Sequence, residues 1–469
     1  MKKFLAIILT ISLVLSANVL AFADFNAPKL TRDEWNMLYN SNYPYNNLPM
    51  LCVGSNESEV SLCWHADKSD ANPCVRLSLN DDMSDYKEFT GKITAAEKDS
   101  QVVCRVAITD LKENTVYYYQ WNIGKEWSNI YKYETKAFGN HKALVVGDIQ
   151  IAEDTRTDSD TQSDIGFNWN NVLAEALKTN PDISYLVSPG DNTSTGRTDS
   201  EWQTLLMPEA VRSLPMALAI GNHDKKGLTY NYYTNMPNEY YGKYFSGIDR
   251  DFWFRYGDVL YLVYASTSGN APDHMAMTKE AISLNEDAKW RIGVVHHGIY
   301  GAGDAIGDTE TELLLSTIFT PIFESYDFDF VITGHTHSQG RSHFMKLGKV
   351  VREAESGKTF TDPEGIIYLN SNSVCEKVIM DYEAEHLAYS FIENDVTTYT
   401  TLEFEGNRMI VETRRGDNSE LLDSITIERT SSERKDNTIG SKIHRFLYKA
   451  VEFAGLVYVK IDELIKSFG

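Results

Sequence analysis

The sequence predicts an all-β sandwich, then a larger α/β (α+β) domain of four layers with two packed sheets, and finally one amphipathic helix. Three observations predict this order. Short alternating strands separated by turn residues fill residues 45–137, and strands alternate with helical segments over residues 141–429. Residues 430–469 read as a polar linker followed by an apolar stripe of helical period. The 469 residues are enough for two or three domains with ample core.

The N-terminus has the layout of a secretory signal peptide, which we place at residues 1–23. Met1-Lys2-Lys3 is positively charged, Phe4–Leu15 is apolar, and Ala21-Phe22-Ala23 has the small residues of a cleavage site. An uncleaved anchor is the alternative. The remaining sequence has no apolar run as long as a membrane span. We therefore expect a secreted or extracytoplasmic protein.

The charge balance argues against a nucleic-acid partner. The formal net charge is −23 and the isoelectric point is near 4.9. A surface of this sign repels a polyanion, so an anionic ligand must be drawn in by local positive charge. The composition therefore favours small ligands.

Residues 45–137 carry the sandwich pattern. Val60–His65, Cys74–Leu79 and Val116–Trp121 are typical of short strands, and turn residues separate them. Leu111, Thr115, Tyr117 and Tyr119 resemble the L-x-x-x-T-x-Y-x-Y corner of fibronectin type III domains, which implies a packing scaffold. Binding to a carbohydrate or to the cell wall is the alternative role of this domain.

Most of the cysteines lie in this first domain. They are Cys52, Cys63, Cys74 and Cys104, whereas Cys375 lies far along the chain. The first four are either disulfide partners or buried apolar residues, and the sequence does not choose between these alternatives. Cys375 is expected in the core rather than as a nucleophile.

Five apolar strand-like runs in the α/β region each end on side chains that bind metals. The runs are Ala143–Val146, Ile183–Val187, Met216–Ile220, Arg291–Val295 and Phe328–Thr333. Buried parallel strands read as continuous apolar runs, and ligands bind beyond the carboxyl ends of such strands. We therefore expect the five following loops to converge on one site.

Helical periodicity appears in two segments of this region, Phe167–Lys178 and Thr311–Tyr326. These helices are expected to cover the sheets. Tyr399–Glu428 returns to strand patterns, and we expect these strands to close the second sheet.

The side chains that follow the five runs form a mixed set of donors. They are Asp148, Asp191, Asn222, His296, His335 and His337. Oxygen and nitrogen donors of this kind suit a pair of divalent cations, and a carboxylate between the ions can bridge them. A Gly-Asp or Gly-Asn pair alone is more often an ordinary turn, and His-x-His alone is often two surface imidazoles. The occurrence of all five motifs in this order argues against ordinary turns and surface imidazoles.

In this order, D-x-Q, GD-N, GNHD, a strand-end His and GHTH resemble the calcineurin-like metallophosphoesterases, in the branch that contains the purple acid phosphatases. The resemblance covers roughly residues 45–405, and it implies two metal sites. The first would use Asp148, Gln150, Asp191 and His337, and the second would use Asp191 as a bridge with Asn222, His296 and His335.

The resemblance also implies roles near the metals. His223 is the expected general acid for the leaving group, and Asp224 is expected to orient it. An N-cap is the alternative role for Asp224. Arg341 and His297 are expected in the substrate-binding pocket, although a solvated surface position suits Arg341 equally well.

Two residues depart from the pattern of ferric relatives. Those relatives have Tyr three residues after the bridging Asp, where this chain has Ser194 after Asp191. Gln150 stands where many relatives have His, and an amide oxygen is a weaker donor than imidazole. Two divalent ions, Mn²⁺, Fe²⁺ or Zn²⁺, are therefore expected, without the phenolate that gives ferric members their colour.

The expected function is a secreted phosphatase that hydrolyses small phosphate monoesters through attack by a hydroxide held between two metals. Hydrolysis of phosphodiesters or nucleotides on the same metal core is the alternative within enzymes. A catalytically dead binding module is the alternative from another class, suggested by Gln150 and the missing Tyr. Metal content and turnover of a monoester and a diester discriminate among these functions.

An apolar stripe at helical spacing runs through residues 439–468. We expect it to pack on its own protein or on a second copy. Attachment to a membrane surface is the alternative, which the acidic Glu452, Asp462 and Glu463 disfavour.

Overall fold

The computed structural model describes residues 28–42, 48–152, 161–242, 250–300, 309–374, 389–393 and 396–431. The predicted signal peptide, Cys375 and the predicted C-terminal helix lie outside these ranges. Within them, no helix is both long enough and apolar enough to cross a bilayer.

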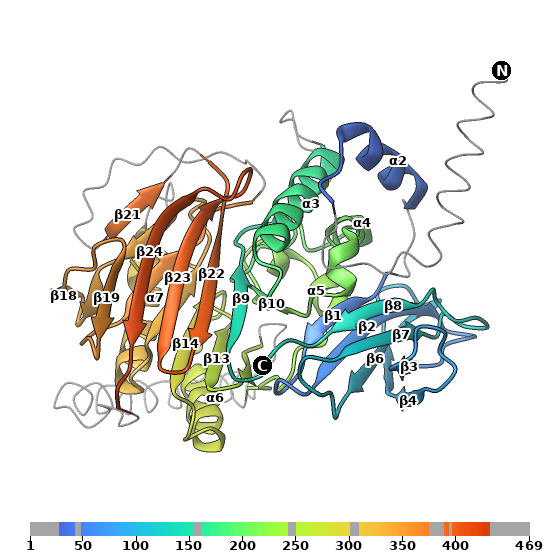
Figure 1. Ribbon diagram of the computed structural model, residues 1–469, viewed down its shortest axis with the longest axis horizontal. Helices are drawn as coiled ribbons and strands as arrows, with labels where there is room; N and C mark the ends of the chain where they lie inside the picture. Colours follow the sequence, from blue (N-terminus) through green and yellow to red (C-terminus); the bar gives the residue numbers. More distant parts are fainter. Residues whose placement is uncertain are drawn as a thin grey trace, which may run out of the picture.

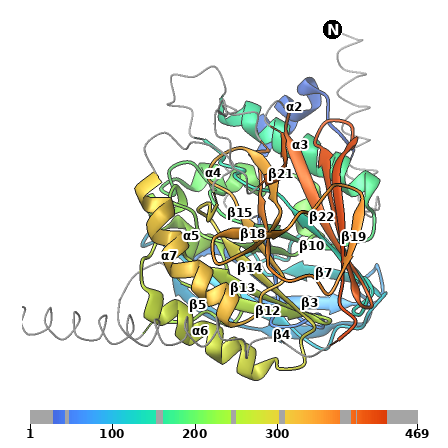
Figure 2. The ribbon, with the colours of Figure 1, turned by 90° about the vertical axis from the view of Figure 1, so that its left-hand side faces the viewer.

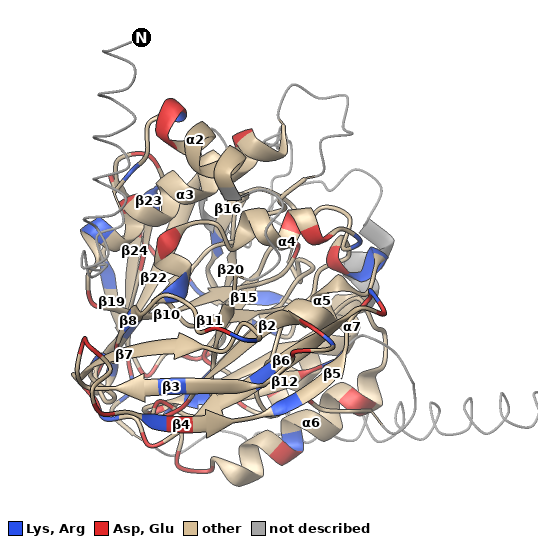
Figure 3. Cartoon of the chain, turned by 90° about the vertical axis from the view of Figure 1, so that its right-hand side faces the viewer, with Lys and Arg blue, Asp and Glu red and all other residues tan. Residues whose placement is uncertain are grey.

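The first domain is the predicted sandwich, with two layers of four strands each. One sheet contains β1 (Met50–Val53), β2 (Val60–Asp67), β6 (Gln101–Ile108) and β5 (Lys92–Ala95), and the other contains β4 (Lys87–Thr90), β3 (Cys74–Ser78), β7 (Val116–Trp121) and β8 (Tyr131–Glu134). Trp64, Val75 and Tyr119 pack together between the sheets. Both basic and acidic residues lie along the outer strands of this domain (Figure 3). Among them, Arg76 forms a 2.9 Å ion pair with Glu88.

The predicted corner near Tyr117 is formed by a local hydrogen bond. The Tyr117 hydroxyl accepts a hydrogen bond from the backbone N–H of Lys112 at 2.7 Å. A tyrosine hydroxyl bonded to the backbone a few residues upstream is the tyrosine corner of sandwich domains. The four cysteines of the sandwich, Cys52, Cys63, Cys74 and Cys104, are buried free thiols. The structure therefore agrees with the alternative that these cysteines are buried apolar residues and not with the alternative that they are disulfide partners.

The sandwich shares a sheet with the second domain, which the sequence did not predict. The shared sheet has eleven strands in the order β19-β24-β23-β22-β9-β10-β11-β1-β2-β6-β5. Its new members are β9 (His141–Val145), β10 (Ile183–Ser188), β11 (Met216–Leu218), β19 (Lys358–Thr361), β22 (Thr398–Glu405), β23 (Arg408–Arg415) and β24 (Leu421–Glu428). Cys52 of β1 pairs in parallel with Met216 of β11 at the junction. The Tyr119 hydroxyl also donates to the Arg212 carbonyl at 2.7 Å there.

The strands at the end of the described chain close the first sheet of the second domain, not its second sheet as predicted. β22 pairs antiparallel with β9, and β23 and β24 follow it outward (Figure 1). The reason is that β9 has an open edge opposite β10, and this edge requires hydrogen-bond partners.

The second sheet contains the other predicted ligand-bearing strands. Its order is β12 (Phe252–Tyr256), β13 (Val259–Tyr264), β14 (Trp290–Val295), β15 (Phe330–Thr333), β20 (Ile367–Asn370), β16 (Gln339–Ser342) and β21 (Tyr389–Glu393). Alternate residues of β13 face opposite sides: Tyr261 packs into the core shared with the first sheet, and Leu262 packs under the helices. Burial on both faces explains why these strands read as continuous apolar runs.

Helices cover the outer faces of the two sheets. The predicted helices are α3 (Gln162–Thr179), beside β9 and β10, and α7 (Thr309–Ser325). Thr161 begins α3 with a capping box that includes Asp164. The sequence did not predict α2 (Arg32–Asn42), α4 (Asp199–Leu205), α5 (Thr229–Tyr233) or α6 (Ala271–Leu284). Figure 2 shows α6 and α7 together on the outer side of β13 and β14.

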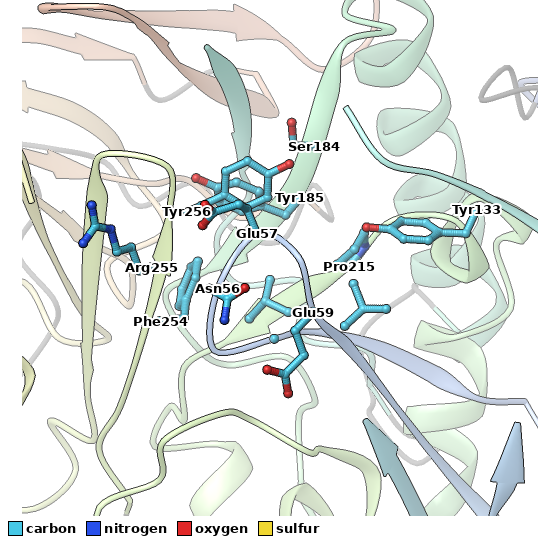
Figure 4. A pocket seen from close by; sticks show the side chains of 13 residues that line it. Asn56, Glu57, Glu59, Tyr133, Ser184, Tyr185, Pro215, Phe254, Arg255 and Tyr256 are labelled. Carbon is cyan, nitrogen blue, oxygen red and sulfur yellow. The ribbon is translucent and has the colours of Figure 1, made fainter. Parts of the chain in front are cut away.

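A pocket lies where the sandwich meets the second domain. Figure 4 shows the rings of Tyr185, Tyr256 and Phe254 beside the loop that carries Glu57. The pocket reaches Ser184 and Pro215, which lie at the amino ends of β10 and β11. It is therefore at the opposite end of these strands from the predicted metal ligands.

Candidate metal centre

The loops after β9, β10, β11, β14 and β15 converge as predicted, and much of their backbone adopts the left-handed conformation. The residues with positive φ are Asp148 (45°), Gln150 (45°), Asp191 (50°), His335 (73°) and His337 (53°). Positive φ is uncommon outside glycine, and strained backbone of this kind gathers at functional sites. Five of the seven predicted ligands therefore have a backbone conformation that is uncommon outside glycine.

Two glycines allow the carboxylates to approach the neighbouring loops. A Cβ atom at Gly221 would lie 2.1 Å from Asp191 Oδ1, and one at Gly334 would lie 2.5 Å from Asp148 Oδ2. Both distances are far below van der Waals contact. The Gly in each of the GN and GH motifs is thus needed because a carboxylate occupies the space of its side chain.

One half of the centre gathers four of the predicted donors. Asn222 Oδ1 lies 2.9 Å from His296 Nε2 and 3.0 Å from His335 Nδ1. His296 Nε2 is 3.2 Å from Asp191 Oδ2, and donor atoms of Asp191, His296 and His335 all lie within 4.8 Å of one another. In octahedral geometry, metal–ligand bonds of about 2.1 Å separate neighbouring donors by about 3 Å, so this set fits a single ion.

The other half is built around Asp148. Its carboxylate accepts the backbone N–H of His335 at 3.0 Å, and its Oδ1 lies 3.5 Å from His337 Nε2. Gln150 is buried in the same loop, and its backbone N–H donates to the Asp191 carbonyl at 2.8 Å. Asp191 therefore contacts both halves, through its backbone carbonyl on the Gln150 side and through its carboxylate on the His296 side.

The buried charges of the centre perturb one another. Burial raises the pKa of Asp148 to about 8, although His296 opposes this shift. Burial also acts on Asp191, but His296 and His223 hold its pKa below the ordinary value. His296 is buried too, yet the charge of Asp191 raises its pKa to about 9. Two buried carboxylates in contact with imidazoles form a site that a cation would stabilise.

His296 presents one ring nitrogen to the centre. Its Nε2 lies 3.2 Å from Asp191 Oδ2 and 2.9 Å from Asn222 Oδ1. An imidazole nitrogen beside a carboxylate and an amide oxygen suits a divalent cation, so the donor set fits divalent metals. Its other nitrogen, Nδ1, is buried without a hydrogen-bond partner among the described residues.

His223 lies at the edge of this centre. Its backbone N–H donates to Asp191 Oδ1 at 2.8 Å, and its ring Nδ1 lies 2.6 Å from the carbonyl oxygen of Ser194. Lys226 Nζ is also 2.8 Å from Nδ1. Burial lowers the pKa of His223. When Nδ1–H donates to Ser194, the other nitrogen, Nε2, remains for proton transfer.

Asp224 does not orient His223, so this prediction is wrong. Its carboxylate accepts hydrogen bonds from the loop after β10: from the Asn192 backbone at 3.1 Å and from the Thr193 backbone at 2.9 Å. The Gly221 N–H donates to it at 3.0 Å. Burial raises the pKa of Asp224 to about 6. Nor is it an N-cap, because it is the first residue of the short helix η3 (Asp224–Lys226).

The structure brings His297 to the centre but not Arg341. The His297 ring lies 4.6 Å from that of His335 and 5.1 Å from that of His296, measured between centroids. Arg341 is fully buried, with Nε and Nη2 paired to the carboxylate of Asp423 and Nη1 donating to carbonyl oxygens. Its guanidinium is therefore occupied by protein groups, and the substrate-binding prediction for Arg341 is wrong.

Sequence reasoning missed Ser266, which follows β13. Its hydroxyl oxygen lies 3.1 Å from the His296 backbone nitrogen and 2.9 Å from His297 Nδ1. No motif marks this serine. However, the apolar run Val259–Tyr264 is a buried strand like its parallel neighbour β14, and this signal could have placed the loop after it at the same edge.

Comparisons with known proteins agree with this arrangement. Residues 141–339 match the model of the calcineurin-like phosphoesterases, and residues 48–135 match that of the purple acid phosphatase N-terminal domain. Purple acid phosphatase 1 of Ipomoea batatas is 25% identical over 304 residues, which cover 60% of this chain and 61% of that protein. The chain thus spans about three fifths of that relative.

A solved structure shows the same fold. A purple acid phosphatase from yellow lupin (Lupinus luteus) seeds matches with a TM-score of 0.67 and 15% identity, covering 81% of this chain and 74% of that chain. At this identity the likeness concerns the fold alone. From the two family matches, residues 141–339 are a calcineurin-like phosphoesterase domain and residues 48–135 are a purple acid phosphatase N-terminal domain.

Proposed function

We propose that this protein is a secreted, metal-dependent phosphatase that hydrolyses phosphate monoesters at the centre formed by Asp148, Gln150, Asp191, Asn222, His296, His335 and His337. The observation that carries the proposal is the Asn222 carboxamide oxygen, which lies within 3.0 Å of a nitrogen of both His296 and His335. An amide oxygen between two imidazoles and a carboxylate is a donor set for a divalent cation.

Asp191 would be shared by two ions, with Asp148, Gln150 and His337 on one side and Asn222, His296 and His335 on the other. A bound pair of divalent ions supplies Lewis-acid stabilisation of the phosphoryl charge and lowers the pKa of the attacking water. The donors include imidazoles, which favour Mn²⁺, Fe²⁺ or Zn²⁺ over Ca²⁺. Ser194 supplies no phenolate at the position where ferric relatives carry Tyr.

His223 is the residue of this chain that would move a proton. Its Nδ1 is directed at the Ser194 carbonyl at 2.6 Å, so proton transfer falls to Nε2. A leaving alkoxide needs a proton, and a positioned general acid contributes typically about 10²–10⁴-fold in rate. His297, packed on His335, would contact the phosphoryl group from the side.

Extracytoplasmic placement rests on residues 1–23, which have the pattern of a signal peptide. The proposed partner is a small phosphate ester, because the net charge of −23 opposes polyanions. Residues 439–468 are proposed to pack on this protein or on a second copy.

The test is turnover of p-nitrophenyl phosphate and bis(p-nitrophenyl) phosphate by the mature protein loaded with Mn²⁺, Fe²⁺ or Zn²⁺. The expected result is a higher kcat/KM for the monoester in at least one metal form. Asn222→Ala should lose this turnover. The control variant Asn129→Ala, which replaces an exposed residue of the sandwich, should keep it. A preference for the diester would replace the proposal with a phosphodiesterase, and metal binding without turnover would indicate a non-catalytic module.

A further inference from the structure

The turn after β13 is bonded to the two adjacent histidines at the end of β14. Ser266 is 3% exposed, and its hydroxyl oxygen has three partners. It lies 3.1 Å from the His296 backbone nitrogen, 3.2 Å from the His297 backbone nitrogen and 2.9 Å from His297 Nδ1. One small side chain thus contacts a predicted metal ligand and its neighbour.

The single proton of the Ser266 hydroxyl determines the direction of each of its hydrogen bonds. A serine hydroxyl has one proton to donate and two lone pairs to accept. The backbone N–H groups of His296 and His297 can only donate, so they use both lone pairs. The hydroxyl proton is therefore directed at His297 Nδ1, which must accept it. A neutral imidazole that accepts at Nδ1 carries its proton on Nε2.

The position of the Ser266 turn is itself fixed from several sides. Asp251 Oδ1 accepts the Ala265 N–H at 2.9 Å, and Asp251 Oδ2 lies 2.6 Å from His274 Nδ1. The other nitrogen of His274 lies 3.0 Å from the Ser268 carbonyl oxygen. Lys225, from the loop of Asn222, donates to the Thr267 carbonyl at 2.8 Å. Supporting bonds of this kind set the orientation of a functional side chain in advance.

The His297 ring then has one nitrogen to offer. The ring is packed against His296 and His335, and its hydrogen bonds within the described part of the chain are to Ser266. Its Nε2–H is a neutral donor beside the predicted metal ligands. A donor at that place matches the oxygen atoms of a phosphoryl group, which accept hydrogen bonds.

We infer that Ser266 is a positioning residue that holds His297 as the Nε2–H tautomer, so that His297 donates a hydrogen bond to the phosphoryl group of the substrate. The inference rests on the proposed function of the same centre. It assigns the second histidine of the pair to substrate and leaves the first, His296, to the metal.

The tautomer can be measured without activity. Mature protein labelled with ¹⁵N-histidine, metal-free and Zn²⁺-loaded, is studied by long-range ¹H–¹⁵N correlation, and His297→Gln assigns the signal. The wild-type ring should carry its proton on Nε2. Ser266→Thr should keep this tautomer because it keeps the hydroxyl, and Ser266→Ala should shift the ring toward Nδ1–H. A wild-type proton on Nδ1, or no change in Ser266→Ala, would overturn the inference.

Binding of inorganic phosphate to the Zn²⁺-loaded protein gives the second measurement. His297→Leu should weaken phosphate binding about 10-fold, because it removes a hydrogen bond to a charged group. His297→Gln should recover most of this loss, since its amide N–H₂ can reach the place of Nε2–H. In turnover, the same variants should raise KM more than they lower kcat. Equal weakening by Leu and Gln, with metal retained, would show that His297 only packs.

Failure of the inference and failure of the proposed function are distinguishable. If the wild-type protein binds metal and phosphate with the predicted tautomer but hydrolyses no ester, the proposed function fails and the role of Ser266 stands. If it hydrolyses monoesters while Ser266→Ala keeps the tautomer, the role of Ser266 fails alone. Loss of bound Zn²⁺ in His297→Leu would instead make His297 a metal ligand and overturn the assignment to substrate.

Discussion

Asp224 and Thr193 are joined by two hydrogen bonds, with the Asp224 carboxylate accepting the Thr193 backbone N–H at 2.9 Å and its hydroxyl at 3.0 Å. Asp224 lies in the loop of Asn222, and Thr193 lies in the loop of Asp191. The pair therefore links two ligand-bearing loops. The GNHD motif consequently carries a ligand, a candidate acid and a structural carboxylate within four residues.

Replacing Asp224 by Asn should destabilise the fold rather than alter the chemistry. Both oxygens of the Asp224 carboxylate accept hydrogen bonds from N–H groups, so the amide N–H₂ of Asn would face such a donor in either orientation. The variant therefore loses a hydrogen bond to a charged group, which lowers the free energy of unfolding by about 1.5–3 kcal/mol. Chemical denaturation measures the free energy of unfolding, and Thr193→Ser serves as the control that keeps both donors. If Asp224→Asn kept its stability but its kcat became more sensitive to the leaving group than that of wild type, Asp224 would have the role of orienting His223.

His223→Ala should retain bound metal and lose rate, mainly for esters with poor leaving groups. Alkyl alcohols need a proton on departure, whereas acidic phenols leave well without one. We expect a loss of about 10²–10⁴-fold for alkyl phosphates and a much smaller loss for p-nitrophenyl phosphate. The measurement is kcat for a series of esters of graded leaving-group pKa. A uniform loss across the series would exclude His223 as the general acid.

Arg341→Met should lower stability and leave the KM of the folded enzyme unchanged. Arg341 and Asp423 form a fully buried ion pair, and removing one partner leaves an uncompensated charge. Breaking such a pair costs about 3–5 kcal/mol. The matched double change Arg341→Met with Asp423→Leu should recover much of the loss. A raised KM at normal stability would place Arg341 at the substrate after all.

Acid should destabilise the protein partly through His141. This histidine is buried against Phe404 and Tyr256, with ring centroids 4.9 Å and 4.6 Å away, and burial lowers its pKa from 6.5 to about 4. Because the folded pKa is depressed, the contribution to stability is complete above pH 6.5 and is lost as the pH falls through about 4. The loss is on the order of 3 kcal/mol.

The check for His141 is the free energy of unfolding of wild type and His141→Phe from pH 7 to pH 4, both in the same metal state. Phe keeps an aromatic ring in the stack and cannot take up a proton. The wild type should lose stability relative to the variant as the pH falls. A difference that stays constant over this range would show that His141 does not take part in acid unfolding.

The strands and the ligand loops were predictable because each depends on a local pattern. The run Ile292–Val295 is apolar because β14 is buried on both faces, and His296 follows where the strand ends. The same pattern, repeated at five strands, was sufficient to bring Asp191, Asn222 and His335 together.

Contacts between distant side chains could not be predicted in this way. Arg341 pairs with Asp423, which is 82 residues away, and a single sequence contains no signal for that partner. The parallel pairing of Cys52 with Met216, which extends the sheet into the sandwich, is likewise a long-range contact. Ser266 was missed because a serine after a strand is common and only its partners distinguish it.

In our proposal, the convergent side chains hold the metal on which turnover depends. The most direct measurement is bound metal and monoester turnover for wild type and Asn222→Ala, as purified, after chelation and after return of Mn²⁺, Fe²⁺ or Zn²⁺. Wild type should lose turnover with its metal and regain it with a divalent ion, and Asn222→Ala should bind about one ion fewer and stay inactive. Full turnover by wild-type protein verified to be metal-free would show that hydrolysis does not depend on a bound metal.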